Sequence, residues 1–136
     1  MNYDPIFDKW HEECGVFGVF DRTVDVARYV YWGLFALQHR GQESAGIAIT
    51  DGNEVALKKG MGLLTEAIKE LPTLKSHMGT GHVRYSTTGS NNPRNIQPLV
   101  IHYQGGQIAV AHNGNLTNAL GTVSYTHLRA HETRSN

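Results

Sequence analysis

Residues 45–59 read Ala-Gly-Ile-Ala-Ile-Thr-Asp-Gly-Asn-Glu-Val-Ala-Leu-Lys-Lys, and this stretch decides the fold class. The apolar run at its start and the second run that follows both look like β-strands. Asp-Gly-Asn at 51–53 lies between them, and Asp-Gly is a strong hairpin signal because glycine accepts the backbone angles of tight turns. We therefore expect an antiparallel pair of strands at 45–50 and 54–59.

Further strands are expected on both sides of this hairpin. They are short runs rich in Val, Ile or Phe, at 15–20, 80–85, 99–103 and 107–112. The first is expected to be a buried strand. The last two flank Gln-Gly-Gly at 104–106 and form a second predicted hairpin.

Two helices are expected between the strands. The segment 24–38 repeats apolar residues three to four positions apart, at Val26, Val30, Leu34 and either Phe35 or Leu37. His39 and Arg40 fall in its last turn, and Gly41 can end it. A shorter helix at 63–71 stops before a proline. Because helices and strands come in pairs rather than alternating singly, we expect an α+β fold with antiparallel sheets and helices packed outside.

The composition excludes several classes of protein. The 136 residues carry 12 basic and 12 acidic side chains, so there is no basic field that would attract nucleic acid. No apolar run approaches the roughly 20 residues that span a bilayer, so no membrane partner is expected. The single cysteine, Cys14, excludes an intrachain disulfide and favours a cytoplasmic location.

The two ends of the chain are expected to lie outside the folded domain. Residues 1–13 lack the apolar centre of a secretory signal and form a leader ahead of Cys14. Residues 123–133 are compatible with the translated sequence of a transposon-based sequencing adapter. We therefore expect 121–136 to be an adapter artefact, and 14–120 to be a partial domain from a longer protein.

Four motifs carry polar side chains next to predicted strands. They are Cys-Gly-Val-Phe-Gly at 14–18, His-Arg-Gly-Gln-Glu-Ser-Ala-Gly at 39–46, Gly-His-Val-Arg-Tyr-Ser-Thr at 81–87 and His-Asn-Gly-Asn-Leu-Thr-Asn at 112–118. Taken singly, each has an ordinary interpretation: Cys14 is a small buried hydrophobe, Arg84 is an exposed strand end, and Asn113-Gly114 is a turn. Each motif also has a functional interpretation. An arginine guanidinium can bind a carboxylate through two hydrogen bonds, and adjacent Asn and Gly donors can form an oxyanion hole.

In this order the four motifs resemble the class II glutamine amidotransferases, whose glutaminase domains use an N-terminal nucleophile. The resemblance covers about residues 12–119. Within the family, the motifs are most similar to the branch that makes phosphoribosylamine in the first committed step of purine synthesis. Gln42-Glu43-Ser44 and the segment 83–87 point away from the branch that aminates fructose 6-phosphate. The resemblance implies an Ntn-hydrolase four-layer αββα sandwich with antiparallel sheets, incomplete here at its C-terminal side.

The resemblance also implies catalytic roles. Removal of residues 1–13 would expose the α-amine of Cys14, which can then act as a general base for its own thiol. The thiolate attacks the side-chain amide of glutamine, and Asn113 and Gly114 are the residues that the family pattern assigns to the oxyanion.

Substrate-binding and interdomain roles are implied as well. Arg84 matches the arginine that holds the α-carboxylate of glutamine, with Thr87 nearby on the same loop. Arg40 and Tyr85 match positions associated with communication to the synthase half of the enzyme.

The rest of the family's machinery is missing from this sequence. A substrate-binding aspartate would lie beyond Leu120, and the phosphoribosyltransferase domain that takes phosphoribosyl pyrophosphate is absent. We expect no cofactor in this segment; magnesium belongs to the missing half, where relatives with a leader often hold a [4Fe–4S] cluster. Glutamine is the expected substrate, and the complete protein is expected to be a homo-oligomer. The 136-residue chain itself is expected to be poorly active or inactive.

Two other interpretations stay open. The first is a different glutamine-dependent amidotransferase, which the sequence of the downstream domain would identify. The second is a non-catalytic binding or regulatory relic. It would be favoured if the protein kept its leader, because an internal Cys14 has no free amine.

Overall fold

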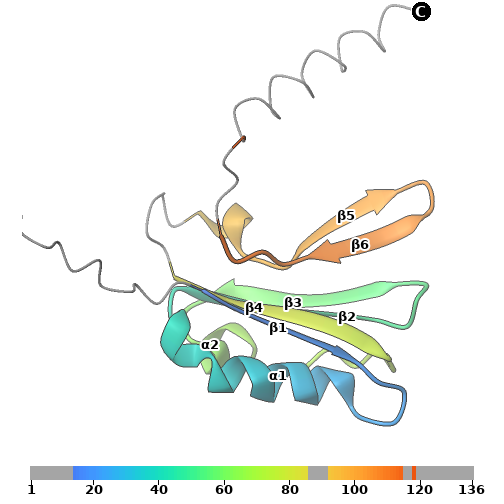
Figure 1. Ribbon diagram of the computed structural model, residues 1–136, viewed down its shortest axis with the longest axis horizontal. Helices are drawn as coiled ribbons and strands as arrows, with labels where there is room; N and C mark the ends of the chain where they lie inside the picture. Colours follow the sequence, from blue (N-terminus) through green and yellow to red (C-terminus); the bar gives the residue numbers. More distant parts are fainter. Residues whose placement is uncertain (1–13, 86–91, 115–117, 119–136) are drawn as a thin grey trace, which may run out of the picture.

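The computed structural model describes residues 14–85, 92–114 and 118, and its larger sheet has four strands in the spatial order β1-β4-β2-β3 (Figure 1). Their bounds are Gly15–Phe20 for β1, Ser44–Thr50 for β2, Val55–Met61 for β3 and Met78–Arg84 for β4. Every neighbouring pair is antiparallel. A second, two-stranded antiparallel sheet consists of β5, Leu99–Tyr103, and β6, Gly106–Val110.

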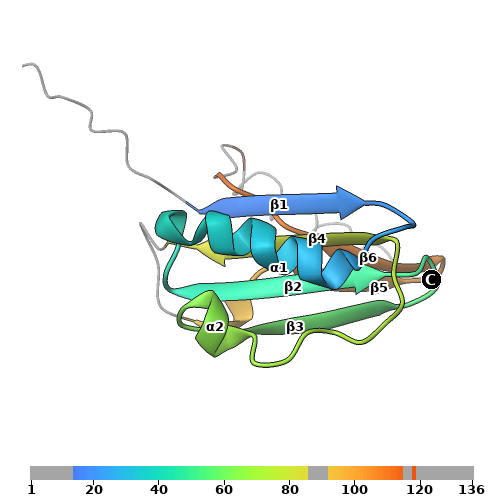
Figure 2. The same cartoon turned by 90° about the horizontal axis from the view of Figure 1, so that it is seen from below.

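The helices and the smaller sheet lie on opposite faces of the larger sheet. Helix α1 covers Val26–Ala36 and the short helix α2 covers Leu64–Ala67, both on one face (Figures 1 and 2). Strands β5 and β6 lie over the other face. This gives three layers, helix–sheet–sheet, and confirms the predicted α+β class with antiparallel sheets. The outer helical layer expected next to β5 and β6 has no counterpart among the described residues.

The hairpin at 45–59 is confirmed. Strands β2 and β3 pair in register, with Ile47 opposite Lys58, and Gly52 in the connection has a φ of +100°. A positive φ is the conformation for which glycine is favoured in tight turns. The second predicted hairpin, β5–β6, is confirmed as well.

The core lies between α1 and the larger sheet. Val26, Val30 and Leu34 are each at most 1% exposed, so the predicted apolar face of the helix is confirmed. The helix approaches the sheet closely because β4 presents glycine there: a Cβ added at Gly81 would lie 2.6 Å from Leu34 Cδ1. Asp25 caps the helix N-terminus by accepting a hydrogen bond from the main-chain N–H of Arg28 at 3.2 Å.

Three predicted elements differ from the structure. The helix predicted at 24–38 ends at Ala36, and a separate 3₁₀ turn follows at Gln38–Arg40; another covers Pro93–Asn95. The helix predicted at 63–71 is a single turn, because so short a segment gains little from helix formation and Pro72 disfavours a helical residue before it.

The third difference concerns β1. Among the described residues it is an edge strand rather than a buried one, since there it pairs with β4 alone and its residues alternate between the core and the opposite side. Val16 and Phe20 are 38% and 67% exposed.

Both predicted terminal segments, 1–13 and 121–136, lie outside the described residues. In the part of the chain that the structure describes, none of the helices has the length and apolar character needed to cross a membrane.

Candidate active site

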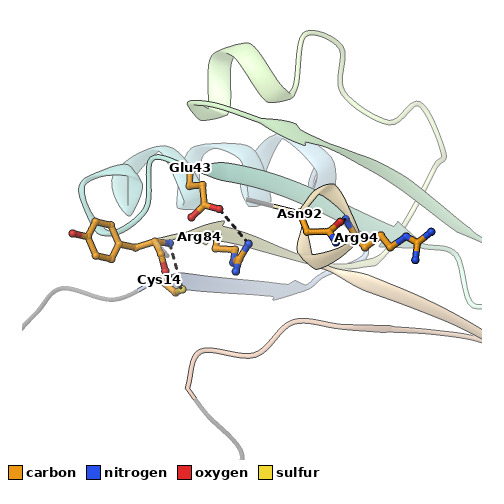
Figure 3. Close-up of polar contacts among 6 residues, drawn as sticks. Cys14, Glu43, Arg84, Asn92 and Arg94 are labelled. Carbon is orange, nitrogen blue, oxygen red and sulfur yellow. Dashed lines mark hydrogen bonds and ion pairs between the residues drawn. The ribbon is translucent and has the colours of Figure 1, made fainter. Parts of the chain in front are cut away.

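Cys14 lies just before β1, at the end of the larger sheet where β4 finishes. Its thiol contacts the main chain of Tyr85: the Tyr85 N–H donates to Sγ at 3.5 Å, and Sγ donates to the Tyr85 carbonyl oxygen at 3.6 Å (Figure 3). The φ of Cys14 is +39°, which among the described residues is the one positive value outside glycine. A non-glycine residue in that region costs about 1–3 kcal/mol, so the surrounding contacts must hold it there.

Two side chains from distant parts of the chain converge on the carbonyl oxygen of Cys14. Arg40 donates to it from Nε at 2.8 Å, and Asn113 donates from Nδ2 at 3.3 Å. In the sequence, Cys14 is 26 positions from Arg40, 71 from Tyr85 and 99 from Asn113. The fold therefore brings all four sequence motifs to one place.

Gly41 makes this convergence possible, by a different physical mechanism from the one predicted. Its φ is −159°, an extended conformation that any residue adopts, so it does not end the helix through a left-handed turn. Instead, a Cβ at this position would lie 2.6–2.7 Å from main-chain atoms of Val83 and Arg84. Only glycine lets the segment that carries Arg40 lie against the end of β4.

The side chain of Gln38 pins the same segment from the other side. It donates to the carbonyl oxygen of Gly41 and accepts from the main-chain N–H of Leu64 at 2.7 Å. The segment is therefore tied to α2 as well as to β4. A glutamine beside a basic pair gave no signal of this structural role in the sequence.

Arg84 ends β4 and pairs with Glu43, which precedes β2. Arg84 Nη1 lies 3.2 Å from Glu43 Oε1, and the two side chains are 14% and 13% exposed (Figure 3). The main-chain N–H of Glu43 also donates to the carbonyl oxygen of Arg84 at 3.0 Å. From the sequence, Glu43 served only to distinguish branches of the family and was given no role in the site; the available signal was the density of polar residues just ahead of the apolar run of β2.

Asn113 and Gly114 follow β6, and the structure places the first of them at Cys14. The approach is fixed by His112, whose main-chain N–H donates to Gln97 Oε1 at 2.6 Å. Gly114 has a φ of +142°, where a side chain would be strained. The predicted residue Thr87 lies outside the described residues.

His82 is a buried histidine that the sequence interpretation passed over. It is 0% exposed in the middle of β4, and neither ring nitrogen makes a hydrogen bond within the described residues. Burial lowers the pKa of His82 to about 4, helped by the charges of Arg84 and His112 and opposed by the nearby main chain of His112. At neutral pH the ring is uncharged, so it does not repel the Arg84 guanidinium two residues away.

A metal centre is a separate question. In residues 14–85, 92–114 and 118, no group of three or more His, Cys, Asp or Glu side chains is arranged to hold a metal ion. Cys14, the one cysteine of the chain, is a free thiol.

Comparison with known proteins agrees with this geometry. The family model of class II glutamine amidotransferases matches residues 35–131. The chain is 46% identical over 113 residues to the amidophosphoribosyltransferase of Methanothermobacter thermautotrophicus, covering 80% of this chain and 24% of that protein. It is 50% identical over 109 residues to the Methanocaldococcus jannaschii enzyme, covering 78% and 23%.

Solved structures give the same result. Glutamine phosphoribosylpyrophosphate amidotransferase from B. subtilis, in complex with ADP and GMP, superposes with a TM-score of 0.75 at 42% identity. The match covers 84% of this chain and 25% of that one. The chain thus spans about a quarter of the length of the proteins it matches.

Proposed function

This chain belongs to the class II glutamine amidotransferases, and on that premise we propose that residues 14–120 are the glutaminase part of an amidophosphoribosyltransferase. The complete enzyme converts glutamine and phosphoribosyl pyrophosphate to phosphoribosylamine, the first step of purine synthesis. The observation that carries the proposal is the convergence of Arg40, Tyr85 and Asn113 on Cys14.

The proposed reaction begins with removal of residues 1–13, which gives Cys14 a free α-amine. An α-amine titrates near pH 8, so a neutral fraction is present in the cell and can take the proton from Sγ. The sulfur then bonds to the amide carbon of glutamine. Asn113 and Gly114 stabilise the resulting oxyanion, and one such donor contributes roughly 3 kcal/mol to lowering the barrier.

The intermediate then collapses in two steps. The carbon–nitrogen bond breaks, the α-ammonium returns its proton to the leaving group, and ammonia departs. Water attacks the thioester, releasing glutamate and restoring the thiol. Through both steps Arg40 holds the carbonyl of Cys14, and Arg84 with Thr87 holds the α-carboxylate of the substrate.

The proposal extends to the remainder of the protein. Ammonia passes to a phosphoribosyltransferase part outside this chain, which binds phosphoribosyl pyrophosphate and magnesium and is the place for an iron–sulfur cluster. Arg40 and Tyr85 adjoin the nucleophile Cys14. We assign them the role of communicating between the glutaminase site and the phosphoribosyltransferase part. We also propose a cytoplasmic homo-oligomer, the location being supported by the single free cysteine.

Substitution of Cys14 tests this function. In the complete enzyme that contains this segment, Cys14→Ala should lower glutamine hydrolysis by at least about 10³-fold, since the nucleophile is lost. Intact mass should show loss of residues 1–13 in the wild type and not in the variant. Full glutaminase activity in Cys14→Ala would refute the assignment. Robust hydrolysis by the isolated 136-residue chain would refute the prediction that this chain is poorly active.

A further inference from the structure

Glu43 is tied to Arg84 through both its side chain and its main chain. The Glu43 carboxylate accepts from Arg84 Nη1 at 3.2 Å, and the Glu43 N–H donates to the Arg84 carbonyl oxygen at 3.0 Å. The next residue, Ser44, lies directly opposite Arg84 in the antiparallel register of β2 and β4. These contacts place the carboxylate beside the guanidinium at the end of β4.

The main chain of Glu43 is fixed independently of the arginine side chain. Its carbonyl oxygen accepts from the N–H of Gly62 at 2.7 Å, so both of its main-chain groups are bonded. The close contact of Gly41 with Val83 and Arg84 holds the preceding segment against the same strand. The main chain that carries the carboxylate is therefore held in place without the Arg84 side chain. Pairing with Glu43 orders that long side chain in advance, so it has less rotamer freedom to lose when it binds a substrate.

The charges of this pair are balanced almost entirely by each other. Within the part of the chain that the structure describes, Glu43 is the one carboxylate in an ion pair with Arg84. The second carboxylate oxygen, Oε2, is buried and has no hydrogen-bond partner among the described residues. A largely buried guanidinium without this partner would be costly to keep in place.

The pair leaves Arg84 able to bind a second carboxylate. An arginine has five N–H donors in a planar fork, and Glu43 is bonded to Nη1 alone. The remaining donors suffice for a two-point contact with a substrate carboxylate. A fixed acid on one side of the guanidinium orients its other side.

We propose that Glu43 positions Arg84 to receive the α-carboxylate of glutamine, and so contributes to selection of an α-amino acid amide over a simple amide. This inference rests on the proposed function. Glu43 acts through Arg84 and is not itself a catalytic residue.

The test compares two substrates in the complete, processed enzyme. Glu43→Gln should lower kcat/KM for glutamine about tenfold, mainly through KM, because the charge-assisted contact that orients Arg84 is weakened. The kcat/KM for 4-aminobutanamide, which is glutamine without its α-carboxylate, should stay unchanged. Glu43→Asp, which keeps the charge on a shorter side chain, should recover part of the loss.

Glu70→Gln, at an exposed position outside the site, is the matched control and should leave kcat/KM unchanged for both substrates. Equal losses with both substrates in Glu43→Gln would mean a general structural role and would overturn the proposal. An unchanged or lower KM for glutamine would overturn it too.

Binding separates this inference from the proposed function. Calorimetry in a complete Cys14→Ala enzyme whose gene lacks codons 2–13 needs neither turnover nor processing, and adding Glu43→Gln there should raise the Kd for glutamine about tenfold. An unaltered Kd would overturn the role of Glu43. Hydrolysis that persists in Cys14→Ala would reject the nucleophile and leave the binding result standing.

Discussion

The two faces of the larger sheet are built for different purposes. On the helix face, Gly79 and Gly81 of β4 let α1 approach until Val30 and Leu34 are fully buried. Because side chains alternate along a strand, Thr80, His82 and Arg84 point to the opposite face. There the two sheets leave a cleft of about 610 Å³ between them, lined by residues of β1, β2, β4 and β6 and by Val55 of β3.

The comparison shows that one face of the sheet is packed for stability, whereas the other face carries polar groups. The helix face is closed by shape complementarity, which gives a well-ordered core. The other face holds a paired arginine, Arg84, and a histidine, His82, whose ring nitrogens have no hydrogen-bond partner among the described residues. The cleft lies at the far end of the strands from Cys14, so it is distinct from the candidate active site.

The largest effect on stability is expected on the helix face. Leu34→Ala should lower the free energy of unfolding by about 2–5 kcal/mol, because the residue is 0% exposed and the site cannot collapse around the loss. Urea unfolding of the chain followed by circular dichroism measures this. Phe35→Ala, at a half-exposed position in the same helix, is the control and should cost much less. Similar losses for the two would contradict a closed helix face.

A smaller loss of stability is expected when the pH is lowered, because His82 on the other face becomes protonated on unfolding. The pKa of His82 is about 4 in the folded chain, against 6.5 for an ordinary histidine. The unfolded state therefore binds more protons between these values. The contribution of His82 to stability should be constant above about pH 6.5 and should fall as the pH drops toward 4, by about 3 kcal/mol at most.

Urea unfolding at several pH values tests this prediction. His82→Leu should remove the histidine part of the slope, whereas His102→Gln, at an exposed position of β5, should retain it. An identical slope in His82→Leu would show that other groups cause the acid sensitivity.

The smallest effect is expected at Thr80, on the same face as His82. Its hydroxyl donates to the carbonyl oxygen of Phe17 at 3.2 Å and ties β4 to β1. Thr80→Val should cost about 1 kcal/mol in the same unfolding measurement, the net value of one hydrogen bond. Thr73→Val, at an exposed position, should be neutral. A loss as large as that of Leu34→Ala would erase the distinction between the two faces.

Local patterns in the sequence predicted much of the fold. Asp-Gly-Asn fixed the β2–β3 hairpin, and the spacing of Val26, Val30 and Leu34 identified the buried side of α1. The edge position of β1 could not be predicted, because it depends on which strand pairs with which, and no local pattern records that. The length of α2 depends on tertiary contacts that outweigh helix propensity.

The candidate site was predictable in its members and less so in its contacts. Cys14, Arg84 and Asn113 were identifiable because each belongs to a motif that resembles a known family. Glu43 was not, because an acid beside a strand is common and its meaning depends on an arginine 41 positions away. The close approach at Gly41 was likewise hidden, since a glycine can serve a turn or a tight contact equally well.

The backbone angle at Cys14 has a consequence for the timing of activation. A φ torsion is defined by the carbonyl carbon of the preceding residue, so the +39° value exists only while Glu13 is attached. The proposed cleavage at that bond would abolish the torsion, and its conformational cost would disappear with it. Arg40 and Asn113 would still hold the carbonyl of Cys14, so rotation about the Cα–C and Cα–Cβ bonds of that residue alone would then set where the new amine and the thiol lie.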